Sequence, residues 1–465
     1  MEIGCFQSSE KILKIQAFSN YPINSKNQYL PIQKNEQLQS HKNHLALATV
    51  GCLATVCAGV ALGCYFYKKG KTPLQKNNGL VDPQTIVNKV KQDFICLCKS
   101  VTCENYRATK QNINSGVFSI DLHSHSTHSD GWAYVHNLLD QVADYANCVH
   151  QKTGKKFTFA LTDHDRVSGV EEALKIIKSN PKKYENINFI PGVEFSFAFN
   201  SNGQIRFGEM FAYFVDPSSK EMKILVEELN TNRLKMIEEG IKKLGQGFSK
   251  NEMDDYFINR DGETFAYCLH YRLFNYAQIK NRINKIAQER GENAEHLYRK
   301  FMQEYVFKKN SRVQKPEVSP QGFDKYLKEN NIETQTPMLD ENITKICEEF
   351  FPKIIDGKIV CKTENSFEKI IDTLKNNDDV VLAFAHPYFT AKHMKDYKKE
   401  FLAFLKYANG KILMSENYHQ AYPQDIMNKN RSFIEEINDF LLSQNLIPIG
   451  GRDNHDKDFF KQLSS

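Results

Sequence analysis

Short apolar runs and amphipathic segments alternate along the second half of the chain. The runs are rich in Val, Ile and Phe, and they occupy residues 117–122, 157–161, 187–190, 210–215, 380–384, 411–414 and 446–449. Between the runs, apolar positions recur with helical spacing, as at Val170, Ala173, Leu174 and Ile177. Short apolar runs favour buried strands and the longer period favours helices, so the pattern predicts an α/β fold of alternating strands and helices.

Each predicted strand is followed within a few residues by His, Asp or Glu. Seven strand and helix units with polar residues at the strand ends are typical of a barrel of parallel strands, whose active site lies at that end. A closed barrel brings residues that are distant in the sequence to one rim. The sequence therefore predicts that these scattered side chains form one cluster.

Two motifs place possible metal ligands at alternate positions of a strand end, namely His123 with His125 and Asp453 with His455. Alternate residues of a strand point to the same side, so both members of a pair can reach one cation. One pair alone could equally be two hydrogen-bonded histidines. The full set, however, has five histidines and three carboxylates: His123, His125, Asp130, His164, Glu194, His386, Asp453 and His455. Such a mixture suits Zn²⁺, Mn²⁺ or Fe²⁺ better than Ca²⁺.

An uncharged stretch of 23 residues spans 45–67. As a helix it would measure roughly 34 Å, enough to cross a hydrocarbon core of about 30 Å. Several lysines follow it and few precede it, which predicts a single-pass membrane protein whose C-terminal catalytic domain faces the cytoplasm. Gly59 and Gly63 form a G-x-x-x-G pattern that would permit a weak homodimer.

Composition excludes several classes of protein. Of the 465 residues, 41% are hydrophobic, and the mean hydropathy is −0.53. These values exclude wholesale disorder and a polytopic membrane protein. A net charge of +5, from 61 basic and 56 acidic residues, is too weak to predict stable binding of duplex nucleic acid. Eleven cysteines without framework spacing indicate reduced thiols.

The same patterns predict where one part of the chain gives way to the next. A region with little periodicity predicts a disordered tail, and a charged helical region interrupts the predicted barrel. The expected parts are a tail at 1–44, the membrane helix at 45–67, a spacer with one amphipathic helix at 68–115, the first part of the barrel at 116–245, a helical insertion at 246–350 and the second part of the barrel at 351–465. The insertion could cap the site or be an ordinary helical subdomain.

Five motifs, in order, resemble the signatures of the polymerase and histidinol phosphatase (PHP) family. They are DLHSHSTHSDG, LTDHD followed by SGVEEA, PGVEFS, AHP and GGRDNHD, within residues 117–245 and 375–460. The resemblance implies a distorted (β/α)7 barrel that holds two or three divalent ions (Mn, Zn or Fe) and hydrolyses phosphate esters. It also implies that the eight residues above are metal ligands, and that the substrate is a phosphorylated small molecule, a nucleotide or an RNA end.

Three positions relate to the family pattern in particular ways. Glu209 stands where this branch of the family usually carries a histidine, and its carboxylate could serve as the ligand instead. Arg452 replaces a usually small residue, and it could bind a phosphate or pair with a nearby carboxylate. Arg233 falls where the branch tends to carry an arginine, so it could reach a phosphate or lie on a solvated helix face.

Three further residues are candidates for catalysis. Asp163 and Asp165 flank His164, so they could orient ligand imidazoles, carry protons or cap a helix. His128 lies between ligands in the first motif, and we expect it to contact substrate or transfer a proton. The expected reaction is hydrolysis by a water shared between two cations, with Glu194 bridging them.

Two other functions fit parts of the pattern. One is a catalytically impaired, membrane-tethered binding module, because Glu209 departs from the family pattern. The other is a metal-dependent amidohydrolase, because such barrels also begin with His-x-His, although the TDHD and Glu motifs disfavour it.

Overall fold

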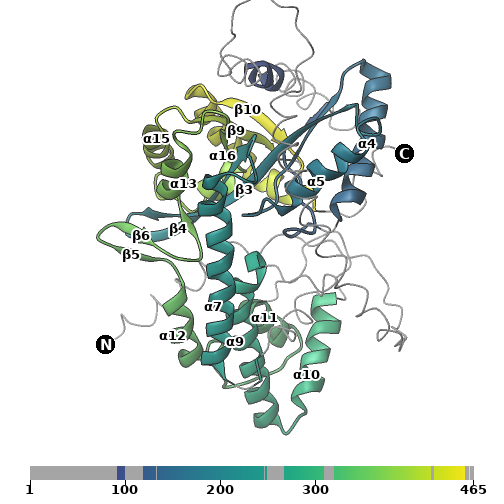
Figure 1. Ribbon diagram of the computed structural model, residues 1–465. Coiled ribbons are helices and arrows are strands. Elements are labelled where there is room, and N and C mark those ends of the chain that lie inside the picture. Colours follow the sequence, from purple (N-terminus) through teal and green to yellow (C-terminus); the bar gives the residue numbers. More distant parts are fainter. Residues whose placement is uncertain are drawn as a thin grey trace, which may run out of the picture. The chain divides into compact units, whose positions relative to one another are not determined.

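The computed structural model describes residues 92–99, 119–131, 133–245, 247–248, 266–307, 319–419, 424–455 and 460. These residues form a mixed α/β structure around one large sheet (Figure 1). Seven strands of this sheet lie in the order β1-β2-β3-β4-β8-β9-β10. Their bounds are Ile120–Asp121 (β1), Phe157–Leu161 (β2), Ile187–Ser201 (β3), Gln204–Tyr213 (β4), Val381–Phe384 (β8), Ile412–His419 (β9) and Ile447–Gly451 (β10). Every apolar run of the sequence pattern therefore contributes a strand.

The sheet curls into a nearly closed barrel. The backbone N–H of Leu122 donates to Gly450 O at 3.3 Å, next to β1 and β10. A parallel bridge between Ser124 and Asn454 continues this contact past the strand ends. The first and last strands of the sheet are thus neighbours, as the predicted barrel requires.

One strand of this sheet runs against the expected direction. The described neighbours pair in parallel except at β4, which is antiparallel to both β3 and β8. The cause is a tight hairpin, in which Asn202 and Gly203 both have positive φ, at 51° and 78°. A two-residue Asn-Gly turn of this kind joins antiparallel strands. Because β4 is reversed, Glu209 rather than Asp216 lies at the same end of the barrel as Glu194, which corrects the expectation of an all-parallel barrel.

Helices cover the outside of the barrel. They bury apolar side chains against the outer faces of the strands, as Phe401 and Phe404 do in the largest cluster. The helices packed around the sheet are α4 (Val135–Thr153), α5 (Ser168–Ser179), α6 (Lys220–Met222), the π-helical turn η2 (Lys223–Glu227), α13 (Phe367–Leu374), α14 (Pro387–Ala391), α15 (Tyr397–Ala408) and α16 (Gln424–Ser443).

A second group of helices packs on the distal half of α7 (Glu228–Leu244), which runs from the barrel to them (Figure 1). Met236 and Ile237 of α7 share a core with Leu273 and Phe274. The other helices of the described part of the insertion are α9 (Ala266–Arg290), α10 (Ala294–Phe301), the π-helical turn η3 (Met302–Phe307), α11 (Pro320–Glu329) and α12 (Glu341–Phe350). The chain returns to the barrel through three short strands, β5 (Lys353–Ile355), β6 (Lys358–Val360) and β7 (Asn365–Ser366).

The inside of the barrel is an apolar core. Leu122, Ala160 and Met414 are buried there with neighbouring strand residues. Residues 92–99 form a helix whose Phe94 packs edge-on against Phe214, with ring centroids 4.8 Å apart.

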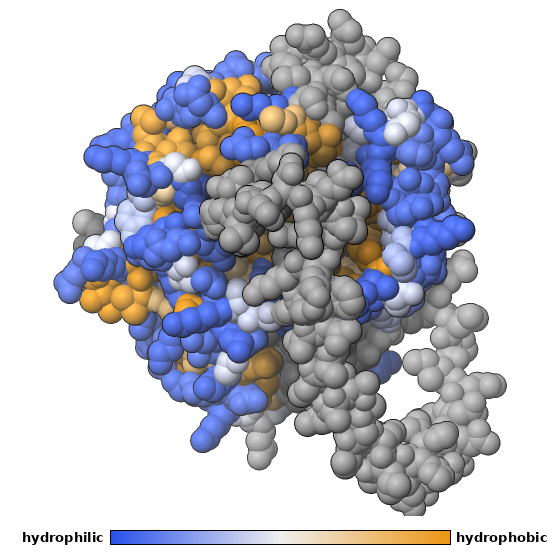
Figure 2. Space-filling model, turned by 45° about the horizontal axis from the view of Figure 1, so that its top comes forward, coloured by the Kyte–Doolittle hydropathy of each residue, from blue (hydrophilic) through white to orange (hydrophobic). Residues whose placement is uncertain are grey.

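On the face shown in Figure 2, hydrophilic residues cover most of the described surface, and hydrophobic residues form separate patches. The barrel is therefore a packed scaffold whose polar cluster is confined to one rim.

The prediction of a single-pass membrane localisation is corrected. Residues 45–67 lie outside the described residues, as do Gly59 and Gly63, the predicted tail at 1–44 and most of the predicted spacer. Within the described ranges, no helix combines the length and the apolar character that a bilayer requires. Even α9, at 25 residues, carries Arg and Lys along its length. The predicted single-pass, cytoplasm-facing localisation is therefore contradicted and not retained.

Candidate metal centre

Nine ligand-type side chains, carried by several strands and the loops that follow them, meet at one rim of the barrel. They are His123, His125, Asp130, His164, Glu194, Glu209, His386, Asp453 and His455. Within four overlapping groups of three or four residues, the ligand atoms all lie within 4.8 Å of one another. All nine are buried except His455, which is partly exposed. The structure thus brings together all nine residues that the sequence predicts as metal ligands.

Glu194 on β3 lies in the middle of this cluster. Its Oε2 is 3.0 Å from His123 Nε2, 3.2 Å from His125 Nε2 and 3.4 Å from His164 Nδ1. Its other oxygen, Oε1, is 3.0 Å from His386 Nε2. One carboxylate therefore faces four imidazoles with both oxygens, as a carboxylate that bridges two cations would.

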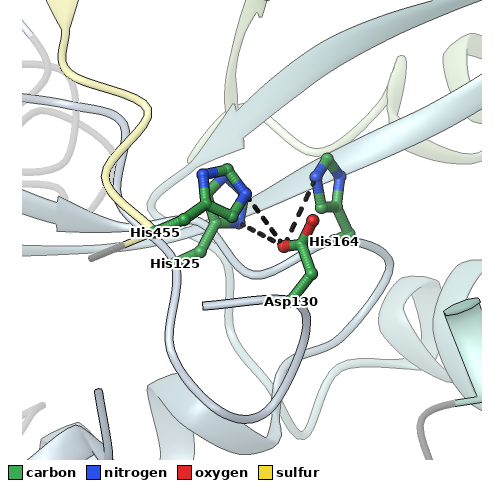
Figure 3. Close-up of side chains that lie close together, drawn as sticks. All are labelled: His125, Asp130, His164 and His455. Atoms are coloured by element: carbon green, nitrogen blue, oxygen red, sulfur yellow. Dashed lines mark ion pairs between the residues drawn. The ribbon is translucent and has the colours of Figure 1, made fainter. Parts of the chain in front are cut away.

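Asp130 is a second carboxylate that faces several imidazoles, at the edge of the cluster (Figure 3). Its Oδ1 faces His455 Nε2 at 3.0 Å, His125 Nδ1 at 3.7 Å and His164 Nε2 at 3.8 Å. Burial alone would raise the pKa of Asp130, but His455 and His164 hold this pKa well below its usual range. His125 and His164 each present one ring nitrogen to Asp130 and the other to Glu194, so these two imidazoles lie between the two carboxylates.

Glu209 completes the cluster from the reversed strand β4. Its Oε2 lies 3.3 Å from His386 Nε2, and its Oε1 lies 3.9 Å from His164 Nδ1. Ser196 Oγ donates to the same Oε1 at 3.5 Å. A carboxylate therefore occupies the position for which the family resemblance implies an imidazole.

Two of the predicted ligands have an unusual positive backbone φ angle. His386 has φ 22° and Asp453 has φ 48°, in the left-handed region that non-glycine residues seldom adopt. Gly451, just before Arg452 and Asp453, lets β10 approach closely, because a Cβ there would lie 2.2 Å from His123 Cβ and 2.7 Å from Glu416 Oε1. The backbone at His386, Gly451 and Asp453 thus has conformations or close contacts that most residues could not adopt.

Nearby carboxylates raise the pKa of His125 and His386, whereas burial lowers the pKa of His164 to about 4. Burial alone would lower the pKa of His125, but Asp453 and Glu194 accept hydrogen bonds from its ring and raise this pKa to about 10. Burial also opposes a charge on His386, yet Glu209 and Glu194 raise its pKa to about 9. The rim therefore attracts positive charge, which divalent cations would also supply.

The donor set and its spacing fit divalent cations. Bonds of about 2.0–2.2 Å from one ion to N and O ligands place neighbouring ligand atoms about 2.8–3.6 Å apart, with octahedral geometry at the short end of this range and tetrahedral geometry at the long end. His123 Nε2 and His125 Nε2 are 2.9 Å apart, and each lies 3.1–3.2 Å from Asp453 Oδ1. Imidazole and carboxylate together suit Zn²⁺, Mn²⁺ or Fe²⁺.

Glu416 on β9 belongs to the site, although the sequence did not predict it. Its Oε1 accepts from His123 Nδ1 at 3.0 Å, and its Oε2 accepts from the backbone N–H of His386 at 2.9 Å. Glu416 follows the apolar run at 411–414, and this position at a predicted strand end is the sequence signal for it. It turns the His123 ring so that Nε2 faces Glu194.

Asp163 organises the loop that follows β1. It accepts hydrogen bonds from Ser126 N–H and Oγ and from Ser129 Oγ, at 2.7–2.8 Å. Ser129 Oγ lies 3.4 Å from His125 Nδ1. The cap of α5 shows no side-chain hydrogen bond. Of the predicted alternatives, the contacts of Asp163 favour orienting a ligand over capping a helix.

His128 lies away from the nine residues. Its Nδ1 is 2.8 Å from Ser168 Oγ, and its Nε2 is 2.8 Å from Glu172 Oε2. Both partners belong to α5. The expected contact with substrate is therefore not supported by the position of this ring.

The two arginines are buried in ion pairs. Arg233 is fully buried and donates to Asp165 Oδ2 at 2.8 Å, so it lies neither on a solvated helix face nor in the cluster. Arg452 Nε lies 3.8 Å from Asp121 Oδ2, and the guanidinium lies over the Tyr145 ring. Of the alternatives for Arg452, pairing with a nearby carboxylate is the one observed.

Asp165 is fully engaged by its neighbours. Its Oδ1 accepts from Ser196 N–H at 3.2 Å, while its Oδ2 receives the hydrogen bond from Arg233. Burial raises the pKa of Asp165, Arg233 lowers it and the nearby Glu364 raises it, with a net increase. Both oxygens are thus engaged with fixed donors, which favours a role in orienting His164 over one in carrying protons.

The comparisons with known proteins add little to this geometry. No protein-family model and no curated protein matches the chain. A candidate metal-dependent phosphoesterase from Bifidobacterium adolescentis is similar at 14% identity and a TM-score of 0.40, over 73% of this chain and 88% of that chain. An amidohydrolase from Chromobacterium violaceum is similar at 16% identity and a TM-score of 0.34, with the same coverage. Scores this low at such identities assign neither a fold nor an activity.

Proposed function

We propose that this protein is a metal-dependent hydrolase of phosphate esters, of the PHP type. The observation that carries the proposal is the convergence of five histidines and four carboxylates, from strands and loops far apart in the sequence, on one rim. Burying so many ionisable groups is costly unless they coordinate metal or pair closely. A site that only stabilised the barrel would be better filled by apolar side chains, as the barrel interior is.

The residues would hold two or three cations, of Mn, Zn or Fe. His123, His125, Glu194 and Asp453 would hold one ion, and Asp130, His164 and His455 would hold another, because the neutral imidazole of His125 can give its one lone pair to a single ion. Glu209 and His386 face Glu194 from the other side and would complete the set. When bound, such ions lower the pKa of a coordinated water and neutralise charge on phosphoryl oxygens.

The side chains would prepare the site before substrate arrives. Asp163 holds the loop that carries His125 and Asp130, and Glu416 holds the ring of His123. Because these ligands are fixed by hydrogen bonds and burial, little reorganisation accompanies the reaction. The substrate would be a phosphorylated small molecule, a nucleotide or an RNA end, bound through its phosphate.

The proposal is tested with the full chain loaded with Mn²⁺ or Zn²⁺. We expect hydrolysis of 4-nitrophenyl phosphate and of adenosine 5′-monophosphate. His123→Ala and Asp453→Ala should each lower kcat by about 100-fold or more, because each removes a predicted ligand from the centre of the cluster. His150→Ala, on the exposed face of α4, is the matched control and should keep wild-type turnover.

Two results would contradict this function. Turnover of a 4-nitroanilide but of no phosphate ester would point to an amidohydrolase. Absence of any turnover by metal-loaded protein would favour a barrel that binds ligands without catalysis, with Glu209 as the altered position.

A further inference from the structure

The helical insertion joins the barrel through a narrow neck of two segments. The chain leaves along α7, and it returns at residues 363–366, where β7 pairs with Phe197 and Ala198 of β3. Thr363, Glu364 and Asn365 of the returning segment are buried. The returning segment of the neck therefore lies beside the strand that carries Glu194.

Arg233 ties the two segments of the neck together. Its Nε donates to Thr363 O at 2.8 Å, and its Nη2 lies 3.2 Å from Glu364 Oε2. The same Nη2 donates to Asp165 Oδ2 at 2.8 Å. Arg233 and both carboxylates are almost completely buried. One guanidinium thus joins the outgoing helix, the returning segment and the barrel rim.

The turn at Asp165 is held from both sides. Asn230, one turn before Arg233 on α7, donates from Nδ2 to Asp165 O at 2.7 Å. On the barrel side, Asp165 N–H donates to Glu194 O at 2.9 Å, and Ser196 N–H donates to Asp165 Oδ1 at 3.2 Å. Asp165 has φ 47°, a conformation that costs a non-glycine residue about 1–3 kcal/mol unless its surroundings hold it.

This turn sets the relation between two predicted ligands. His164 precedes Asp165 directly, and a parallel bridge pairs His164 with Glu194. Movement of α7 or of residues 363–364 would displace Asp165, because Arg233, Glu364 and Asp165 are buried and a bond lost between them leaves its polar groups unpaired. Displacement of Asp165 would then alter the spacing between His164 and Glu194.

We propose that Arg233, Asn230 and Glu364 are positioning residues that fasten the neck of the helical insertion to the His164–Asp165 turn, and so hold His164 and Glu194 in register for metal binding. The proposal rests on the metal-dependent function proposed above. It assigns the helical insertion a role in setting the metal centre rather than only in covering it. It also replaces the predicted contact of Arg233 with a phosphate.

The test measures Mn²⁺ binding to metal-free full-length protein by isothermal titration calorimetry. Asn230→Ala, Glu364→Gln and Arg233→Lys should each weaken Mn²⁺ binding by about 10–100-fold, the usual effect of losing a group that orients a ligand. Lysine keeps the charge of Arg233 but lacks the donors that reach both Thr363 O and the carboxylates. Arg233, Asn230 and Glu364 are together called the clamp below. Asn230→Ala keeps every charge, so it tests the clamp even where a charge variant fails to fold.

Two control variants change residues in α7 and close to the returning segment. Asn232→Ala removes a hydrogen bond from α7 to Lys362 O without touching Asp165, and Glu368→Gln changes an exposed carboxylate of α13. Both controls should bind Mn²⁺ as the wild type does. Thermal unfolding by circular dichroism is recorded alongside, because a purely structural role would lower the melting temperature while leaving the Mn²⁺ affinity of the folded protein intact.

The outcomes separate the two proposals. Wild-type protein that binds no Mn²⁺ would overturn both the clamp and the metal-dependent function. Wild-type protein that binds Mn²⁺, with all three clamp variants within twofold of it, would overturn the clamp alone. Controls that lose affinity as much as the clamp variants would also overturn it, since the effect would not depend on Asp165.

Discussion

Glu416 shows how one carboxylate can orient two predicted ligands at once. It accepts from a ring nitrogen of His123 and from the backbone N–H of His386, the residue with φ 22°. The first bond fixes which ring nitrogen of His123 faces the cluster, and the second holds the strained backbone at His386. Carboxylates that orient metal-ligating imidazoles in this way commonly raise metal affinity.

We therefore expect Glu416→Gln to weaken Mn²⁺ binding by about 10–100-fold, because an amide is a poorer acceptor for the His123 ring. Glu435→Gln, an exposed change on α16, should leave binding unaltered. Calorimetric titration of both proteins measures the difference. Equal affinities would show that the ring of His123 needs no carboxylate to reach the metal.

Among the elements, the helix at residues 92–99 has the most direct consequence for the barrel. Phe94, Ile95 and Cys98 are buried with Tyr213 and Val381, at the end of the barrel away from Glu209. The amphipathic pattern around these residues predicts a spacer, but its apolar face is part of the barrel core. Residues 92–99, which the sequence predicts as part of a spacer, thus pack against the apolar end of the barrel.

Alkylation of thiols tests this packing. Burial raises the pKa of the Cys98 thiol far above its usual range, whereas the side chain of Cys96 is exposed. Since the thiolate is the reactive form, iodoacetamide at mildly alkaline pH should label Cys96 and spare Cys98 in folded protein. Both should react in guanidinium chloride, and peptide mass spectrometry reads out each site. Equal labelling without denaturant would show that this helix does not dock.

At the scale of the whole molecule, metal binding and folding stability should be linked. Ions that bind only the folded barrel stabilise it by RT ln(1 + [L]/Kd), about 2.7 kcal/mol at a concentration of 100 times Kd. We expect Mn²⁺ to raise the melting temperature and a chelator to lower it. The His123→Ala variant should show a much smaller shift. A melting temperature that responds to neither addition would contradict a metal centre built into the fold.

The order of strands and the identity of the predicted ligands followed from local patterns. The apolar runs mark the seven barrel strands, and His123-x-His125 and Asp453-x-His455 mark strand ends, because alternation along a strand is a property of the chain itself. The direction of β4 was also open to prediction, since Asn202-Gly203 between alternating residues is a hairpin signal. The other pairs of this sheet are parallel, so the hairpin is a local departure from the pattern of alternating strands and helices.

The partners of the polar side chains were decided only by the tertiary structure. Arg233, Arg452 and His128 carry chemistry that suits phosphate or proton transfer, yet the fold pairs them with Asp165, Asp121 and Glu172. Glu416 follows one of the predicted strands, but its partners, the His123 ring and the backbone N–H of His386, come from other strands. Residue type limits what a side chain can bind, but which groups surround it depends on contacts between segments far apart in the sequence. Local patterns therefore determined the metal-type cluster, and long-range packing determined what holds it in place.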